Sequence, residues 1–152
     1  MNITSKSKYA LRAVIHMART MPKSARRGDL AAAQGGISTE YLEKILLRLR
    51  ERRIVEAKSG PGGGYRLSVP DTELTAWDII SAVEESPAPV SCLTESPKNC
   101  EGFCEAKSLW VRVWEAAVRE MRNTTIASLA EEAKVLENLG SINAENGVIQ
   151  CR

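Results

Sequence analysis

The sequence has few of the residues on which several protein classes depend. It contains one histidine and no Cys-x-x-Cys pair, so neither a His-acid catalytic arrangement nor a thioredoxin-like redox motif is present, and we expect no enzyme. No apolar run approaches the length of a signal core or a membrane span, which predicts a soluble, cytoplasmic protein with no membrane partner. In that reducing compartment, four cysteines are expected to be thiols or metal ligands rather than a disulfide framework.

Charge is distributed unevenly along the 152 residues. Residues 1–70 carry 14 basic and 5 acidic side chains, a net charge of +9, whereas residues 71–152 carry 7 and 14, a net charge of −7. A basic half is typical of a module that binds a polyanion, and the acidic half must then serve another purpose. The length suits one compact domain with an extension.

Three amphipathic helices are expected in the basic half. The first spans about 5–21 and is followed by a short Ala-rich helix at about 29–34. The glycines at 35–36 allow the positive φ that ends helices, and Ser38 can cap a third helix over 39–53. Two helices joined by a tight glycine turn predict a helix-turn-helix.

A β-hairpin is expected directly after these helices. Residues 54–58 and 65–69 alternate apolar and polar side chains on either side of the glycine-rich stretch 60–64. That stretch is no phosphate-binding loop, because no Gly-Lys-Ser/Thr follows it and the next element is a strand. The predicted fold is therefore mostly α with a small β-hairpin: a winged helix-turn-helix domain over 1–83.

The second half is predicted to contain a loop and more helices. Thr75 and Asp78 form a capping box that opens a helix before residue 84, and prolines keep 86–103 irregular. We expect 84–104 to be a cysteine-bearing sensor loop, called the cysteine loop below. Dimerisation helices are expected over 105–138, the second of them starting at a capping box of Ser128 and Glu131 and ending at Gly140. The last segment, 139–152, lacks periodicity and is expected to be a flexible tail.

An apolar stripe runs along the long helix near the start of 105–138. It is wide for a small domain to cover, and helix-turn-helix proteins commonly bind DNA as dimers, so we favour self-pairing over packing within one subunit. The expected homodimer interface consists of Leu109, Trp110, Val113, Trp114, Ala117 and Met121.

The third helix and the hairpin carry seven basic side chains between residues 44 and 66, against two acids. The start of the second helix of a helix-turn-helix reaches base edges, and a carboxylate such as Glu43 can accept from a cytosine amino group. The alternative is an ordinary surface helix whose acids offset its dipole. The expected residues in contact with double-stranded operator DNA are Ser38, Thr39, Tyr41, Glu43, Lys44, Arg48, Lys58, Ser59, Gly60, Gly62, Gly63 and Tyr65.

Three cysteines lie in the predicted loop 84–104. Cys92, Cys100 and Cys104 are separated by seven and three residues among polar neighbours, so inert buried thiols and a zinc site with paired cysteines are both less favoured than an iron-sulfur cluster. The fourth ligand is open. Cys151 is far away in sequence and has no assigned role, and His16 is best interpreted as a solvated side chain.

At these positions the sequence resembles the Rrf2 family of transcription regulators. The resemblance covers about residues 1–138 and rests on Tyr-Leu-Glu-Lys-Ile-Leu at 41–46, Gly-Pro-Gly-Gly-Gly-Tyr at 60–65, and the three cysteines before a Leu-Trp helix. It implies a homodimer with the start of the third helix in the major groove and the wing in the minor groove. It also implies that the three cysteines hold a cluster of the two-iron or four-iron type.

Three positions depart from the family pattern. Many relatives have Arg immediately before the Gly-Pro of the wing, where this chain has Ser59, which leaves Lys58 as the substitute for reading the minor groove. Relatives that ligate the cluster through a His three residues after the last Cys are not matched, because that position is Lys107. Others recruit an acid or His from the first helix, where Lys8 and Arg12 stand.

Two accounts of function follow. The first is a sequence-specific regulator, a repressor by preference, that senses iron-sulfur status, redox state or nitric oxide through the cluster. The alternative is a metal-free winged-helix repressor controlled by thiol oxidation or by a regulatory protein partner docked on the acidic half. A redox enzyme is a remote third, because no βαβ unit accompanies the thiols.

Overall fold

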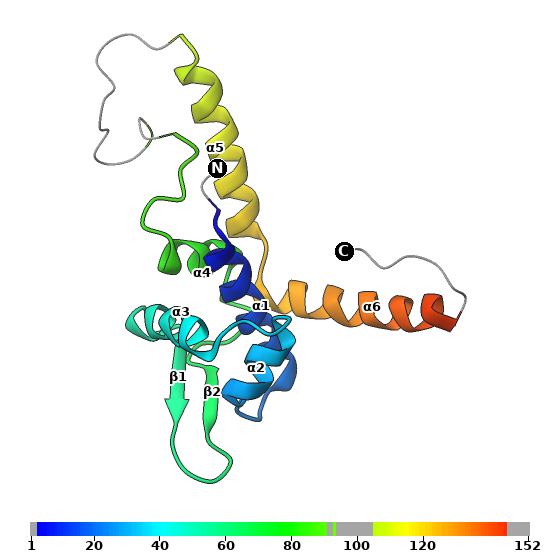
Figure 1. Cartoon of the computed structure of the whole chain (residues 1–152). Helices are drawn as coiled ribbons and strands as arrows, with labels where there is room; N and C mark the ends of the chain where they lie inside the picture. Colours follow the sequence, from blue (N-terminus) through cyan, green and yellow to red (C-terminus); the bar gives the residue numbers. More distant parts are fainter. Residues whose placement is uncertain (1–2, 91–92, 94–104, 146–152) are drawn as a thin grey trace.

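The structure, a computed structural model, describes residues 3–90, 93 and 105–145, with side chains as far as residue 139. Within these residues the chain is mostly α with one small β-hairpin, as predicted (Figure 1). The elements are α1 (Ser5–Thr20), α2 (Arg27–Ala33), α3 (Thr39–Glu51), β1 (Val55–Lys58), β2 (Gly64–Leu67), α4 (Ala76–Val83), α5 (Lys107–Asn123) and α6 (Ile126–Glu145).

The first helix, α1, is the centre of the core. It begins after Thr4, whose hydroxyl accepts a hydrogen bond from the backbone N–H of Lys6 at 3.1 Å. Its small buried side chains allow close approach of neighbours on several sides, and it packs against α2, α3, α4, α6 and β2. The fully buried side chains around it include Ala10, Ala13, Val14, Met17, Leu30, Leu42, Ile45, Leu46, Leu49, Ile79 and Ile126.

The helix-turn-helix has the predicted turn. Gly35 and Gly36 have φ of +80° and +83°, a conformation that glycine adopts without a steric penalty, and α3 starts immediately after Ser38. The start of α2 differs from the prediction, because the helix begins at Arg27 rather than at about residue 29. Arg26 occupies the N-cap position, and its side chain makes no capping hydrogen bond. The sequence therefore contains no capping residue from which this start could be predicted.

The hairpin pairs β1 and β2 in antiparallel register, from Val55 opposite Leu67 to Lys58 opposite Gly64. Each strand has four residues, one fewer than predicted, and β2 starts one residue earlier. Val55 and Leu67 are buried and anchor the base of the hairpin to the core, while the rest of β1 is exposed. The hairpin therefore projects from the domain as a wing.

The predicted capping box of α4 is confirmed. The Asp78 backbone N–H donates to the Thr75 hydroxyl at 3.3 Å, and the Asp78 carboxylate accepts from the Thr75 backbone N–H at 2.9 Å. Because both groups at the helix start are satisfied in this way, the position of α4 against α1 and α3 is well defined.

The predicted start and end of the last helix are wrong. Ser128 lies inside α6, which begins at Ile126, and the residue that accepts from the Ser128 backbone N–H is Thr125, at 3.1 Å. Thr125 therefore caps this helix in place of Ser128, and the fully buried Ile126 that follows packs into the core. The helix also continues past Gly140 to Glu145, and residues 139–145 of the predicted flexible tail are therefore helical.

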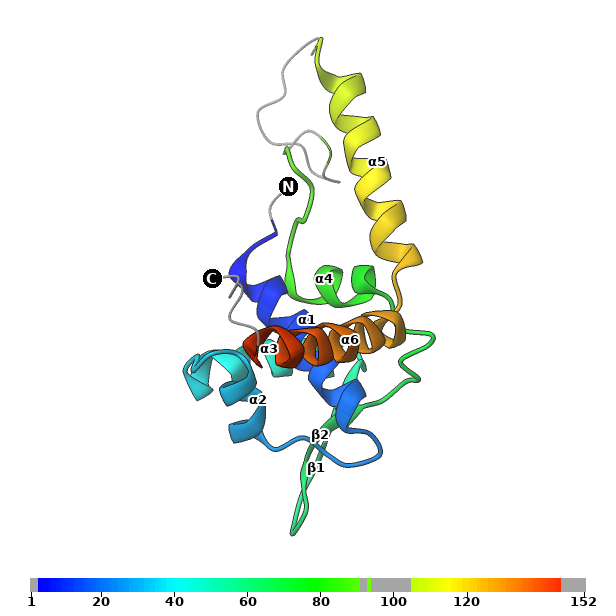
Figure 2. The same ribbon diagram turned by 90° about the vertical axis from the view of Figure 1, so that its right-hand side faces the viewer.

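The two long helices leave the body in different directions (Figures 1 and 2). Helix α6 packs across α1 and extends sideways from the body, whereas α5 packs chiefly against α4 and rises away from the wing. No residue of α5 is buried. The hairpin and α5 thus lie on opposite sides of the folded molecule, and the predicted DNA-contacting elements are separate from the predicted dimer helix.

Candidate nucleic-acid interface

Ser38 fixes the start of α3, the second helix of the helix-turn-helix. Its hydroxyl accepts a hydrogen bond from the backbone N–H of Tyr41 at 3.2 Å, which satisfies one of the unpaired amides of the first turn. Ser38 and Thr39 are exposed, as are Lys44 and Arg48 farther along the helix. The side of α3 that the core leaves free therefore presents hydroxyls and cations to solvent.

The acid that offsets the helix dipole is Glu40. A hydrogen bond with its own backbone N–H and another with the Ser38 hydroxyl hold the pKa of Glu40 below its usual value. A negative charge in the first turn of a helix is favourable because the unpaired amides there carry partial positive charge. Glu40 fills this ordinary role, which leaves the contribution of Glu43 to be explained separately.

Tyr41 is held partly by the core. Its ring meets that of Tyr9 edge to face, with centroids 6.0 Å apart and an interplanar angle of 87°. Tyr41 is half-buried and packs against the core cluster. The position of the side chain at the surface of α3 is thereby fixed before any ligand arrives, as a predicted contact residue requires.

Glu43 forms an ion pair that the sequence did not reveal. The Arg27 Nη1 contacts the Glu43 Oε1, joining the first turn of α2 to the second turn of α3. Both side chains remain substantially exposed, at 53% for Arg27 and 43% for Glu43, so the pair lies at the surface beside the free side of α3. Arg27 was not among the predicted site residues.

A backbone bridge brings the start of α2 next to the wing. The Ala25 N–H donates to the Tyr65 carbonyl at 2.8 Å, and the Tyr65 N–H donates to the Ala25 carbonyl at 2.9 Å. The exposed side chains of Arg26 and Arg27 follow directly. The sequence shows that these two arginines belong to the basic half. That they lie near the wing depends on this bridge, which joins segments 40 residues apart.

The wing tip is exposed at Lys58, Ser59, Gly60 and Gly62, whereas Gly63 and Tyr65 are half-buried. A Cβ at Gly63 would lie 2.3 Å from the Lys58 carbonyl oxygen, so only glycine allows this close turn. Farther down the hairpin, Arg66 pairs with Glu56 across the strands. The tip therefore offers backbone and the exposed side chains of Lys58 and Ser59.

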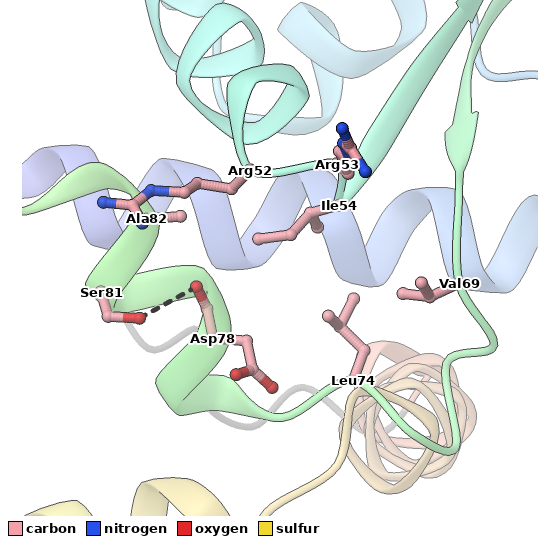
Figure 3. A pocket seen from close by; sticks show the side chains of 8 residues that line it. All are labelled: Arg52, Arg53, Ile54, Val69, Leu74, Asp78, Ser81 and Ala82. Carbon is pink, nitrogen blue, oxygen red and sulfur yellow. Dashed lines mark hydrogen bonds between the residues drawn. The ribbon is translucent and has the colours of Figure 1, made fainter.

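A pocket of about 330 Å³ lies behind α3, between its last residues and α4 (Figure 3). Arg52, Arg53, Asp78 and Ser81 contribute its polar lining. The Asp78 carboxylate is occupied by the capping box, and the Ser81 hydroxyl donates to the Asp78 carbonyl at 3.3 Å. These groups support local structure, and the pocket shows no nucleophile positioned beside a base.

The predicted dimer surface is only partly free. Leu109, Trp110 and Val113 are exposed at 48%, 36% and 44%. Trp114 is half-buried and packs against Trp77 of α4, with ring centroids 5.7 Å apart. Of the other predicted interface residues, Ala117 and Met121 are half-buried. The free part of the stripe is thus the first half of α5, and its second half serves to attach the helix.

Glu84, the first residue of the predicted loop 84–104, forms hydrogen bonds with the start of α1. The Glu84 carboxylate accepts hydrogen bonds from the Thr4 N–H at 3.0 Å, the Thr4 hydroxyl at 2.6 Å and the fully buried Ser7 hydroxyl at 2.6 Å. Burial raises the pKa of Glu84, but the hydrogen bonds from Ser7 and Thr4 outweigh it and hold that pKa below its usual value. Glu84 therefore fastens the start of the loop to the start of α1.

The predicted ligands Cys92, Cys100 and Cys104 lie outside the described residues, as does Cys151. Among the residues that are described, no three His, Cys, Asp or Glu side chains come together as a metal site. His16 is half-buried and lines a surface pocket between α1 and α6 with Arg19 and Glu137.

Comparison with known proteins identifies the family. The profile of the Rrf2 family, described as an iron-dependent transcriptional regulator, matches residues 3–132. The chain belongs to the Rrf2 family. Similar proteins include the HTH-type transcriptional regulator IscR of Serratia proteamaculans, with 33% identity over 139 residues that cover 90% of this chain and 83% of the relative. IscR of Vibrio atlanticus is 32% identical over 140 residues, covering 90% and 79%.

Solved structures share the Rrf2 fold. CymR, the global cysteine regulator of B. subtilis, superimposes with a TM-score of 0.73 at 27% identity, covering 87% of this chain and 98% of that one. The oxidized form of Staphylococcus aureus CymR gives 0.71 at 30% identity, covering 86% and 97%. The T. potens IscR structure, at 22% identity and a TM-score of 0.72 over 99% and 94% of the chains, supports the fold alone.

These findings confirm the winged helix-turn-helix fold and the resemblance seen in the sequence. The Rrf2 relatives are transcriptional regulators and not enzymes, so the chain is a DNA-binding transcription regulator. None of the helices in the described residues is both long and apolar enough to cross a bilayer.

Proposed function

We propose that this Rrf2 regulator is a cytoplasmic homodimer that represses transcription at a specific DNA operator and senses its signal through the cysteine loop. The observation that carries the DNA-reading part is the arrangement of α3 and the wing. The start of α3 presents exposed hydroxyls and cations, and the Ala25–Tyr65 bridge ties the wing to the start of α2. Both elements that would enter the grooves thus belong to one rigid domain.

Most of the predicted contact residues have a distinct chemical role in this proposal. Ser38, Tyr41 and Glu43 face base edges in the major groove, where short hydroxyls and a carboxylate can pair with donors and acceptors. Lys44 and Arg48 bind phosphates and set the register of the helix without reading sequence. The wing tip, Lys58 to Gly63, lies along the minor groove, where its glycines allow close approach of backbone.

The dimer part is supported by the composition and exposure of α5. Leu109, Trp110 and Val113 would be costly to leave in water, and an isologous contact with a second copy would cover them. A symmetric pair of helix-turn-helix domains would then face two half-sites about one helical turn apart. Trp114, Ala117 and Met121 lie farther along the same helix and complete the proposed interface at its edge.

The sensing part rests on the donor chemistry of the loop over 84–104. Cys92, Cys100 and Cys104 supply three thiolates, the ligands that iron-sulfur clusters use, and the family description is that of an iron-dependent regulator. A bound cluster of the two-iron or four-iron type would supply a centre sensitive to oxidants and nitric oxide. The fourth ligand is not assigned, since Lys107, Lys8 and Arg12 occupy positions that supply it in relatives.

The contacts of Glu84 give a route from this loop to the DNA-reading helix. Glu84 is the first residue of the loop and holds Thr4 and Ser7 of α1 through its carboxylate. Helix α1 packs directly on α3. A change in the order of the loop that moved Glu84 would therefore shift α1 and, through it, the angle at which α3 meets DNA.

The DNA proposal is tested by selecting bound sequences from a pool of random duplex DNA with the purified full-length protein. The selected duplex is then used in mobility-shift titrations at several salt concentrations. We expect Arg48→Ala to weaken binding to every sequence and to reduce the salt slope by about one. Arg112→Ala removes an exposed cation from α5, far from the wing, and serves as the control. Selection of no sequence by the wild type would refute the proposal.

The cluster is tested by purifying the protein without oxygen and measuring iron and visible absorbance. Cys92→Ala is expected to lose both, while Cys151→Ala, which removes a thiol outside the loop, should keep them. Colourless protein that takes up no iron on reconstitution would refute the cluster.

A metal-free regulator switched by thiol oxidation is the second candidate. It is supported by the similarity to S. aureus CymR, whose solved structure is described as an oxidized form. A regulatory partner that docks on the acidic half is a variant of the same idea. Iron-free protein whose affinity for the selected duplex changes on treatment with peroxide would favour this candidate.

A further inference from the structure

We propose that Arg27 is a specificity-determining residue of the DNA-reading surface, acting as a positioning residue that holds and neutralises Glu43. The inference rests on the proposed function, because it assumes that α3 reads DNA. It goes further by assigning a role to a residue outside α3 and outside the wing. The observation that carries it is the ion pair between the Arg27 Nη1 and the Glu43 Oε1.

The geometry leaves part of the carboxylate available. The closest contact of Arg27 is with Oε1, and within the described part of the chain no other residue pairs with the Glu43 carboxylate. The side chain is 43% exposed on the side of α3 that the core leaves free. Arg27 thus holds the carboxylate chiefly at Oε1, and the exposed group keeps lone pairs that can accept from a donor such as the amino group of cytosine.

The electrostatic argument points the same way. A carboxylate near a duplex is repelled by phosphates and by the acceptor atoms of guanine, adenine and thymine edges, so a glutamate on a DNA-facing helix is unfavourable unless it finds a donor. Arg27 removes most of the net charge of Glu43 without covering it. The neutralised carboxylate can then approach DNA, and cytosine is the only base whose own major-groove edge carries a hydrogen-bond donor and no acceptor.

The bridge between α2 and the wing explains why Arg27 is in place. The Ala25–Tyr65 hydrogen bonds fix the chain two residues before Arg27, and α2 packs against α3. Arginine also has a planar, always charged group that orients a carboxylate better than the flexible ammonium of lysine. The free protein therefore holds Glu43 in one orientation before binding.

The test compares base preference in five forms of the full-length protein: wild type, Arg27→Ala, Arg27→Lys, Glu43→Gln and the Arg27→Ala/Glu43→Gln double variant. Each selects from the same pool of random duplex DNA, and affinities are measured on the wild-type duplex and on its single-base variants. We expect Arg27→Ala to lower the preference for cytosine at one position per half-site about fivefold. Arg27→Lys should restore part of the preference. In the Glu43→Gln background, loss of Arg27 should change no base preference.

Arg26→Ala is the matched control, because Arg26 is an exposed neighbour with no ion pair among the described residues. It should weaken binding to all duplexes equally and lower the salt slope by about one, with base preference unchanged. If Arg27→Ala behaves like Arg26→Ala, Arg27 is only a phosphate contact and the inference is overturned. If the wild type selects no sequence at all, the proposed function itself fails, which is a different result.

Discussion

Replacing Glu84 with alanine tests whether the junction between the cysteine loop and α1 stabilises the fold. The substitution removes a carboxylate that accepts three hydrogen bonds. Thr4 is exposed, so water can replace its two bonds, and their net loss is small. The Ser7 hydroxyl is 0% exposed and would be left without its partner, which costs about 1–3 kcal/mol. We expect Glu84→Ala to lower the free energy of unfolding by about 2 kcal/mol.

The assay is urea unfolding followed by circular dichroism, with all variants at one protein concentration because association would shift the midpoint. Glu85→Ala removes an exposed neighbouring carboxylate and should change stability by less than about 0.5 kcal/mol. Adding Ser7→Ala to Glu84→Ala should recover about 1 kcal/mol, since no buried hydroxyl then lacks a partner. Equal effects of Glu84→Ala and Glu85→Ala would refute the reasoning.

The same group predicts a pH dependence with a definite sign. The pKa of Glu84 in the folded protein lies below its ordinary value of 4.5, so folding favours the charged carboxylate. Its contribution is complete above pH 4.5 and is lost as the pH falls below that value through the folded pKa. The stability difference between wild type and Glu84→Gln should therefore shrink as the pH is lowered from 7 to below 4.5. A difference that grows on acidification would contradict this assignment.

Three further predictions concern the wing, α3 and α5. Gly64→Ala should destabilise the protein by about 1–3 kcal/mol and weaken DNA binding in mobility-shift titrations, because a Cβ there would lie 2.4 Å from the Ala25 carbonyl oxygen; Gly28→Ala, with open space around it, should do neither. Ser38→Ala should cost about 1 kcal/mol in thermal unfolding by removing the cap of α3, whereas Ser59→Ala at the exposed wing tip should leave stability unchanged. Trp110→Ala should shift the sedimentation coefficient from dimer towards monomer, and Arg112→Ala on the same helix should not; an unchanged coefficient for Trp110→Ala would place the interface elsewhere.

Much of the fold could be predicted because its signals are local. The Ser38 cap, the paired glycines at 35–36 and the capping box of Thr75 and Asp78 each depend on residues within four positions of one another, and all three were predicted. The beginning of α6 could not be predicted in the same way. Thr125 and Ser128 are both possible caps, and the Ser128–Glu131 pattern favoured the wrong one. The structure uses Thr125, which places Ile126 in the core.

The candidate site also contains residues that local signals predict and one, Arg27, that they do not. The exposed residues at the start of α3 follow from helix periodicity, since the apolar stripe leaves one side free. Arg27 was missed because its relevance depends on an ion pair between different helices and on a backbone bridge from Ala25 to Tyr65. Neither contact leaves a periodic trace in the sequence, and only the folded chain brings those positions together.

The bridge between Ala25 and Tyr65 also has a consequence for the kind of duplex that this protein accepts. With the hairpin joined to the segment that leads into α2, the span between α3 and the glycine tip, the two elements proposed to enter the grooves, cannot adjust freely to the DNA. The duplex must instead adapt its own groove widths, which stiff A-tracts and flexible pyrimidine-purine steps do at very different cost. Under the proposed binding mode, the base pairs between the α3 site and the wing site, which no side chain touches, should therefore influence affinity as well.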